Sequence, residues 1–315
     1  MRDVAGTASV LVVGESLFDL VARPHGTAYK RAGGSAANVA VALARLGRPV
    51  QFLTALGDDE HGAALAYLLN QAGVGIVGDP HTLSRTATAM ATIGIDGNAS
   101  YVFDIEWRLG EIPDVSPAAV HTCSIGAVLE PGAAQVQSLL ERLRPDATIS
   151  YDINARPALT GVGPPLVHAV ETIAALADLV KASDEDLESL YPGRSLEASA
   201  AHLLGLGPSA IIITRGGQGA TWIADGLRID VPASRVDIAD TIGAGDTFGA
   251  ATIDALWDLN ALGGRLPALD SAQIESVLRH AVRAAATAVQ EPSGGGGPQA
   301  HGDQGPTVFQ IGLHD

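Results

Sequence analysis

Short apolar runs alternate with helical segments along most of this chain. The first run, SVLVVG at 9–14, is continuous and ends in glycine, which is typical of a strand buried on both faces. A helical segment, SAANVAVALARLG at 35–47, follows it, with Ser35 as a candidate N-cap and Gly47 as its stop. Repeated strand–helix units of this kind predict a mostly parallel sheet with helices on both faces.

The alternation continues to about residue 73, and it resumes from about residue 121 and extends to residue 289. The sequence predicts further strands at 50–57, 121–128, 147–154, 177–183 and 210–217, with two short strands across 219–231. It predicts further helices at 59–73, 132–143, 165–177, 184–190, 245–259 and 272–289. The Gly-rich segment at 292–305 is expected to be a loop.

Two segments do not fit this sheet. The stretch 86–105 is rich in Thr, Ile, Val and aromatic residues and breaks at DGN, which predicts a β-hairpin. The segment 17–32 can pair with it in a small β appendage. We therefore expect one α/β domain over residues 1–315, a three-layer α/β/α fold with an appendage formed by about 15–34 and 86–108.

Composition excludes several classes of partner. A formal net charge of −16 argues against binding to nucleic acid or to an anionic membrane surface, although a local pocket can still hold an anion. The single cysteine, Cys123, leaves no internal disulfide and fits a reducing cytoplasm. The start of the chain, MRDVAGTASVLVVGES, has only a short apolar run and is not expected to be a signal peptide.

The stretch DTIGAGDTFGA at 240–250 places a glycine-rich loop directly before a helix. A helix that begins near Ala244 would expose the N–H groups of Gly243, Ala244 and Gly245, which together with the helix dipole form an anion site. Asp246 would repel a resting phosphate there, but it could take a proton from a hydroxyl that attacks the phosphate. The structural alternative is an aspartate that caps the helix. Neither a Walker loop nor a G-x-G-x-x-G fingerprint is present.

Two long motifs resemble those of the ribokinase-like carbohydrate kinases. The N-terminal one is GGSAANVAVALARLG followed by FLTALG, and the C-terminal one is DTIGAGDTFGAA. The resemblance extends from Val10 to about Ala288. It implies ATP-dependent phosphorylation of a sugar, with Asp246 as the catalytic base, Gly243–Gly245 as the anion hole and the β appendage as a lid.

The resemblance also implies a set of sugar-binding residues. They are Asp19, Gly33, Gly34, Asn38, Glu130 and Arg156, in addition to Asp246. Arg156 belongs to YDINARP, which resembles a D-P-N-x-R stretch with Ile153 in place of proline. Structural alternatives remain, namely a plain loop acid for Asp19 or Glu130 and a helix cap or buried amide for Asn38.

The nucleotide and metal roles follow from the same resemblance. TRGGQGA resembles a nucleotide loop and implies contacts from Thr214, Gly216 and Gly219. Gly245, from the C-terminal motif, is also assigned to the nucleotide, and Gly295 is assigned to the adenine. KASDED stands where the family has N-x-x-E, so Ser183 and Asp186 would act on phosphate and, through water, on Mg²⁺. A helix N-cap is the alternative for Ser183. Asp240 is a candidate ligand for K⁺, with a turn as the alternative.

Fructose is the first choice of substrate, because GESLFDL, GGSAANVA and the hairpin resemble bacterial fructokinases most. 2-Keto-3-deoxygluconate is second, because its kinases resemble this chain in the short start and the lid type. Its carboxylate would need an arginine in the pocket, and Arg31, Arg108 and Arg156 are available. Ribose is third. A sugar- or nucleotide-binding sensor without turnover is the alternative outside the enzymes. Lid strands with an exposed apolar face predict a homodimer through the lid.

Overall fold

The computed structural model describes residues 8–22, 29–93, 99–237 and 239–290 of the 315. A nine-stranded sheet forms the centre of this part of the chain, in the order β15-β14-β13-β12-β11-β10-β1-β4-β6. The strands are β1 (Val10–Val13), β4 (Val50–Leu53), β6 (Gly75–Ile76), β10 (Ala119–Cys123), β11 (Thr148–Asp152), β12 (Leu179–Ser183), β13 (Ala210–Thr214), β14 (Ala220–Ala224) and β15 (Leu227–Val231). All neighbours from β6 to β13 are parallel, and β14 and β15 add an antiparallel edge.

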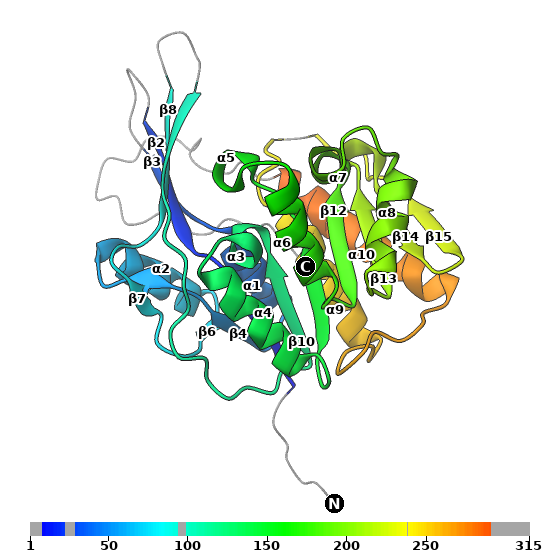
Figure 1. Cartoon of the computed structure of the whole chain (residues 1–315), viewed down its shortest axis with the longest axis horizontal. Coiled ribbons are helices and arrows are strands. Elements are labelled where there is room, and N and C mark those ends of the chain that lie inside the picture. The colour runs from blue at the N-terminus through cyan, green and yellow to red at the C-terminus, as the bar shows by residue number, and fades with distance from the viewer. Residues whose placement is uncertain (1–7, 23–28, 94–98, 238, 291–315) are drawn as a thin grey trace, which may run out of the picture.

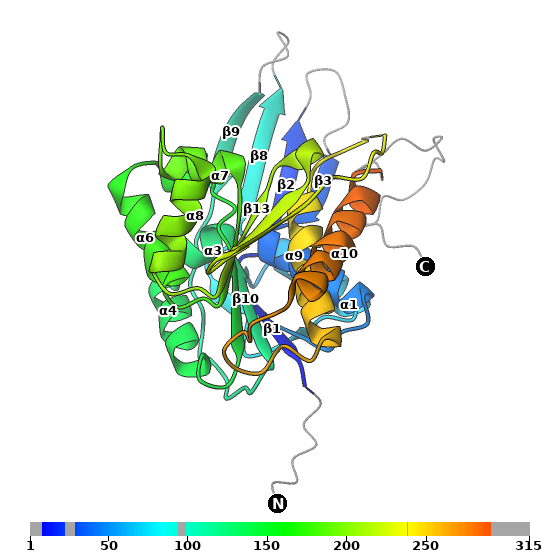
Figure 2. The same cartoon turned by 90° about the vertical axis from the view of Figure 1, so that its right-hand side faces the viewer.

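Helices cover both faces of this sheet (Figures 1 and 2). One layer contains α3 (Ser124–Val128), α4 (Gly132–Leu143), α5 (Pro157–Thr160), α6 (Pro164–Ala174), α7 (Asp184–Leu190) and α8 (Leu196–Gly205). The other contains α1 (Ser35–Arg45), α2 (Glu60–Gln71), α9 (Ala244–Asp258) and α10 (Ser271–Gln290). Strand side chains alternate between the two layers, so that Leu11 and Val13 pack with α4 whereas Val10 and Val12 pack with α1. The expected three-layer α/β/α architecture is confirmed.

A separate four-stranded sheet projects beyond the carboxyl ends of the central strands (Figure 1). Its order is β3-β2-β8-β9, with β2 (Leu17–Ala22), β3 (Tyr29–Gly33), β8 (Thr88–Ile93) and β9 (Ala99–Asp104). β2 pairs antiparallel with β3 and parallel with β8, and β8 pairs antiparallel with β9. The two segments that the sequence set apart therefore form one sheet. A short parallel pair, β5 (Leu56–Gly57) with β7 (His81–Leu83), lies near its base.

Most element boundaries agree with the sequence pattern, but some predictions were wrong and some elements were missed. The predicted strand at 121–128 ends at Cys123, because Ser124 has a left-handed φ of 51° and begins α3. Gly34, with φ 102°, is the N-cap of α1, so Ser35 is the first helical residue and not the cap. The helix α8 was not predicted, although Ser195 caps it by accepting a hydrogen bond from the Ala198 N–H.

Within residues 8–290, apart from the short gaps, no helix is both long and apolar enough to cross a membrane.

Candidate active site

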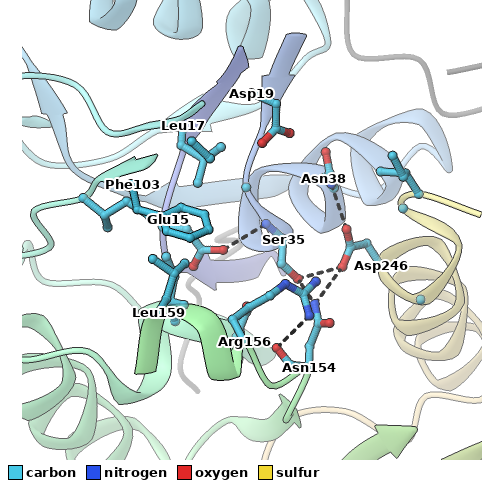
Figure 3. Close-up of a pocket in the computed structure, with 18 of the residues that line it drawn as sticks. Glu15, Leu17, Asp19, Ser35, Asn38, Phe103, Asn154, Arg156, Leu159 and Asp246 are labelled. Carbon is cyan, nitrogen blue, oxygen red and sulfur yellow. Dashed lines mark hydrogen bonds between the residues drawn. The ribbon is translucent and has the colours of Figure 1, made fainter. Parts of the chain in front are cut away.

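A pocket of about 350 Å³ opens between the four-stranded sheet β3-β2-β8-β9, called the lid sheet below, and the carboxyl ends of the central strands. Its polar part comes from the first turns of α1 and α9, from Asn154 after β11, and from Glu15 between β1 and β2. Its apolar wall contains Leu17 and Phe103 from the lid sheet and Leu159 from α5 (Figure 3). The pocket therefore joins segments from both ends of the chain.

Asp246 lies in the first turn of α9, and its carboxylate faces this pocket (Figure 3). The Ser35 hydroxyl donates to Oδ1 at 2.6 Å, and the Asn38 amide donates to Oδ2 at 2.8 Å. The Asn154 amide approaches Oδ1 at 3.5 Å. The N-cap of α9 is Gly243, without a side-chain cap, so Asp246 does not cap its own helix. An ionised carboxylate oriented in this way can accept a proton from a hydroxyl in the pocket.

In the glycine-rich turn before α9, one of the three N–H groups that the sequence predicts to be free has a partner. Gly243 adopts a left-handed conformation with φ 79°, and Gly243 and Gly245 both line the pocket. The Ala244 N–H, however, contacts the Thr241 carbonyl at a long 3.3 Å and is not free. The turn is tighter than the sequence suggested, and the donors that remain at the helix start are consistent with an anion site.

A buried ammonium group lies beneath this turn. Lys181 Nζ donates to Asp152 Oδ2 at 2.7 Å, and a Cβ on Gly245 would lie 3.6 Å from Nζ. Burial opposes the charge, but Asp152, Asp186 and Asp246 outweigh it and raise the pKa of Lys181. Burial, assisted by Lys181, lowers the pKa of the neighbouring His121 to about 3, so that imidazole is neutral. Lys181 is therefore a fixed positive charge close to the predicted anion site.

Glu15 is a pocket residue that the sequence analysis missed. Its two carboxylate oxygens accept hydrogen bonds from the Ser35 N–H at 2.9 Å and the Gly126 N–H at 3.0 Å, so it ties the β1–β2 turn to α1 and α3. Burial raises its pKa to about 7, against the effect of these hydrogen bonds. The available signal was an acid directly after the apolar run of the first strand, in GES.

Several predicted sugar-binding residues do meet at the pocket. Asp19, Gly34, Asn38 and Arg156 line it. A Cβ on Gly33 would lie 2.7 Å from Asp19 Oδ2, so this glycine leaves room for the carboxylate. Burial raises the pKa of Asp19, while Arg31 and Arg156 act in the opposite direction. The Arg156 guanidinium donates to the carbonyls of Asn154 and Ala155 at 3.2 and 2.9 Å.

The residues assigned to nucleotide and metal lie at the same edge of the sheet. Thr214 ends β13, and Gly216 and Gly219 flank the 3₁₀ turn η1 (Gly216–Gln218) with φ values of 45° and 97°. Ser183 forms a capping box with Asp186, which confirms the N-cap alternative. The two oxygens of Asp186 accept the N–H groups of Ser183 and Ala155, each at 2.8 Å.

Two further predicted residues do not line the pocket, and a third is not described. Glu130 follows α3 and accepts the Ala134 N–H at 3.3 Å, and it is not among the residues that line the pocket. Asp240 accepts the Ile242 N–H at 2.9 Å, as the turn alternative predicts. Gly295 lies outside the described residues. No group of three or more His, Cys, Asp or Glu side chains suited to a metal ion is found in the described ranges.

Comparison with known proteins gives a consistent result. A family model described as pfkB family carbohydrate kinase matches residues 7–300. The fructokinase of Rhizobium leguminosarum bv. trifolii is 33% identical over 260 residues, which cover 78% of this chain and 79% of that protein. Fructokinase-1 of Oryza sativa subsp. japonica is 34% identical over 272 residues, which cover 79% and 84%.

Solved structures show the same architecture. Fructokinase with bound ATP from Xylella fastidiosa has a TM-score of 0.77 at 29% identity, covering 90% of this chain and 92% of that one. Aminoimidazole riboside kinase from Salmonella enterica, complexed with aminoimidazole riboside and an ATP analogue, has a TM-score of 0.72 at 26% identity, covering 90% and 94%.

The buried Glu15 predicts how stability depends on pH. Its folded-state pKa of about 7 lies above the ordinary value of 4.5, so the native state binds this proton more tightly than the unfolded chain does. The stabilisation is complete below about pH 4.5 and is lost as the pH rises towards 7, with a slope of at most about 1.4 kcal/mol per pH unit. Glu15→Gln should remove this contribution.

Urea unfolding of the wild type and Glu15→Gln at several pH values between 5 and 8 tests the prediction. Other titrating groups are common to both proteins and cancel in the difference. The wild type should lose more unfolding free energy than the variant as the pH rises. Parallel curves would contradict the assignment of a raised pKa to Glu15.

Proposed function

The chain belongs to the pfkB family of carbohydrate kinases, and we propose that it transfers the terminal phosphate of ATP to a primary hydroxyl of fructose. The observation that carries this proposal is Asp246, oriented by Ser35 and Asn38 at the glycine-rich start of α9 and facing a pocket. The names of the rhizobial and rice relatives support fructose. The ATP bound to the similar structure from Xylella supports ATP.

In the proposed reaction Asp246 removes the proton of the sugar hydroxyl as that oxygen attacks the γ-phosphorus. The bond from phosphorus to the β–γ bridging oxygen breaks, and ADP leaves with the electron pair. The N–H groups at the start of α9 and the Lys181 ammonium lie where they can stabilise the negative charge of the transferred group. Asp246 returns its proton to solvent after the product leaves.

The charges around the pocket favour a neutral sugar over a sugar acid. Asp19, Glu15 and Asp246 are all carboxyl groups, and hydroxyls can donate to each of them. Of the three arginines that a sugar acid could use, Arg108 donates to the Thr82 carbonyl at 2.8 Å. Arg156 donates to two backbone carbonyls, and the charge of Arg31 acts to lower the pKa of Asp19. These interactions place fructose ahead of 2-keto-3-deoxygluconate, and ribose remains third.

We propose that the nucleotide lies along Thr214, Gly216 and Gly219, at the carboxyl ends of β12 and β13. Mg²⁺ supplies positive charge that bridges the phosphates when it is bound. Both oxygens of Asp186 already accept backbone N–H groups, so this residue fits a role towards Mg²⁺ through water better than direct coordination. Asp240 as a K⁺ ligand and Gly295 as an adenine contact remain predictions.

An ATP-consumption assay tests the substrate. The purified protein would be supplied with Mg²⁺ and K⁺ and with fructose, 2-keto-3-deoxygluconate, ribose, tagatose or adenosine in turn. Fructose should give the highest kcat/KM, and EDTA should abolish turnover. A higher kcat/KM with 2-keto-3-deoxygluconate would refute the argument from charge. Sugar binding without turnover of any member would favour a sensor and contradict the proposed reaction.

Asp246→Asn tests the catalytic base. The amide preserves the shape of the side chain but cannot accept the proton, so kcat should fall by about 10²–10⁴-fold while sugar binding is nearly retained. Steady-state kinetics and calorimetric sugar titration measure the two quantities. Glu197→Gln is a matched control, because Glu197 also lies in the first turn of a helix but outside the pocket. Near-normal turnover of Asp246→Asn would show that another group is the base.

We also propose a homodimer through the lid. Ala89 and Phe103 line the pocket, so their neighbours Met90 and Val102, which pair across β8 and β9, point to the opposite face. These two apolar side chains are 40% and 64% exposed. A second copy of the same face would bury them and cover the sheet edges.

Val102→Glu should convert the dimer to a monomer, because it places a charge in the proposed interface. Light scattering at micromolar concentration measures the mass. Val162→Glu is the control, since Val162 is 66% exposed but lies outside the lid, and this variant should remain dimeric. A monomeric wild type, or a dimer that persists in Val102→Glu, would contradict the lid interface.

A further inference from the structure

Ser35 occupies an unusual position in the hydrogen bonding of the pocket. It is the first residue of α1 and is only 7% exposed. Its N–H donates to Glu15 at 2.9 Å, and its hydroxyl contacts Asp246 Oδ1 at 2.6 Å and Asn154 Nδ2 at 2.8 Å. The backbone and side chain of this one residue thus connect the β1–β2 turn, the segment after β11 and the start of α9 (Figure 3).

The chemistry of the two partners fixes the direction of the hydroxyl proton. The Asn154 amide nitrogen can only donate, so the Ser35 oxygen accepts from it. The ionised Asp246 carboxylate can only accept, so the single hydroxyl hydrogen points to Oδ1. A hydrogen bond from a hydroxyl to a carboxylate is short and stronger than one between neutral groups, which agrees with the 2.6 Å separation.

The charges that face Asp246 come from several elements. The carboxyl groups of Glu15, after β1, and Asp152, on β11, repel the negative charge on Asp246. The Lys181 ammonium on β12 attracts the negative charge on Asp246, and Arg156 lines the same pocket. Ser35 and Asn38 supply the direct donors, one to each oxygen of the carboxylate.

From this geometry we propose that Ser35 is a positioning residue, which holds the ionised carboxylate of Asp246 in the orientation needed to accept the proton of the sugar hydroxyl. The inference rests on the proposed role of Asp246 as the base. Asn154 assists by orienting the Ser35 hydroxyl, and Glu15 assists by fixing the backbone of Ser35. The effect of Ser35 should therefore appear in the rate and the pH dependence of catalysis more than in the affinity for sugar.

The test is Ser35→Ala, which removes the hydroxyl and leaves a good helix-forming residue. With the sugar that the wild type turns over fastest, kcat should fall about tenfold while KM for the sugar changes by less than about threefold. The acid limb of the kcat profile should move up by about one pH unit, because the ionised form of the base has lost a charge-assisted hydrogen bond.

Two further variants support the interpretation. Ser35→Thr keeps the hydroxyl and should keep the acid limb at its wild-type position. Asn154→Gly suits the left-handed φ of 38° at this position but removes the amide that orients the hydroxyl, so it should move the limb in the same direction as Ser35→Ala, by less.

Ser16→Ala is the matched control. Ser16 is 1% exposed and accepts from the Thr54 hydroxyl at 3.2 Å, and it does not contact Asp246. Its loss should leave the pH profile unchanged. A wild-type acid limb and kcat in both Ser35→Ala and Asn154→Gly would overturn the proposal. Asp246→Asn distinguishes failure of this proposal from failure of the proposed reaction. Its kcat reports whether Asp246 is the base, independently of the result with the Ser35 variants.

Discussion

The contact between the first turns of α1 and α9 is the interaction on which the pocket depends. Ser35 and Asp246 are separated by 211 residues, yet their side chains meet at 2.6 Å. Both helices start at the carboxyl edge of the parallel sheet, where two positive dipole ends favour a carboxylate. Glycine at each N-cap, Gly34 and Gly243, permits the positive φ angles of 102° and 79° from which the helices begin.

The buried charges under this contact bear on the proposed anion site of an otherwise acidic protein. Lys181 is a buried cation directly beneath Gly245, paired with Asp152. Removing either partner would leave the other buried without compensation, which is far more destabilising than losing an exposed ion pair. His121 remains neutral beside it, so the positive charge is confined to one ammonium group. The net charge of −16 therefore does not describe the field at the pocket.

Local patterns in the sequence predicted the elements, but long-range hydrogen bonds decided the roles of single residues. The bounds of α4 and α7 follow from apolar periodicity and flanking residues, and they agree with the structure. Glu15 could not be found in this way, because its importance comes from N–H groups 20 and 111 residues away. The sequence indicated a role for Asp186 towards Mg²⁺ through water, but it did not reveal that the same carboxylate caps α7 and accepts the Ala155 N–H. Glu130 does not line the pocket and accepts the Ala134 N–H, a contact that the sequence did not indicate.

The turn between β1 and β2 connects the proposed sugar ligand, Asp19, with the proposed base, Asp246. Asp19 lies on β2, and the same turn carries Glu15, which fixes the backbone of Ser35. A Cβ on Gly34 would lie 2.6 Å from the Glu15 carbonyl, so the lid base and the start of α1 are in direct contact. Any displacement of the lid that moves Asp19 must therefore be absorbed within a few residues of the side chain that orients Asp246. Because a tightly packed contact transmits displacement, a sugar bound by Asp19 in the proposed way would be mechanically linked to the orientation of the proposed base.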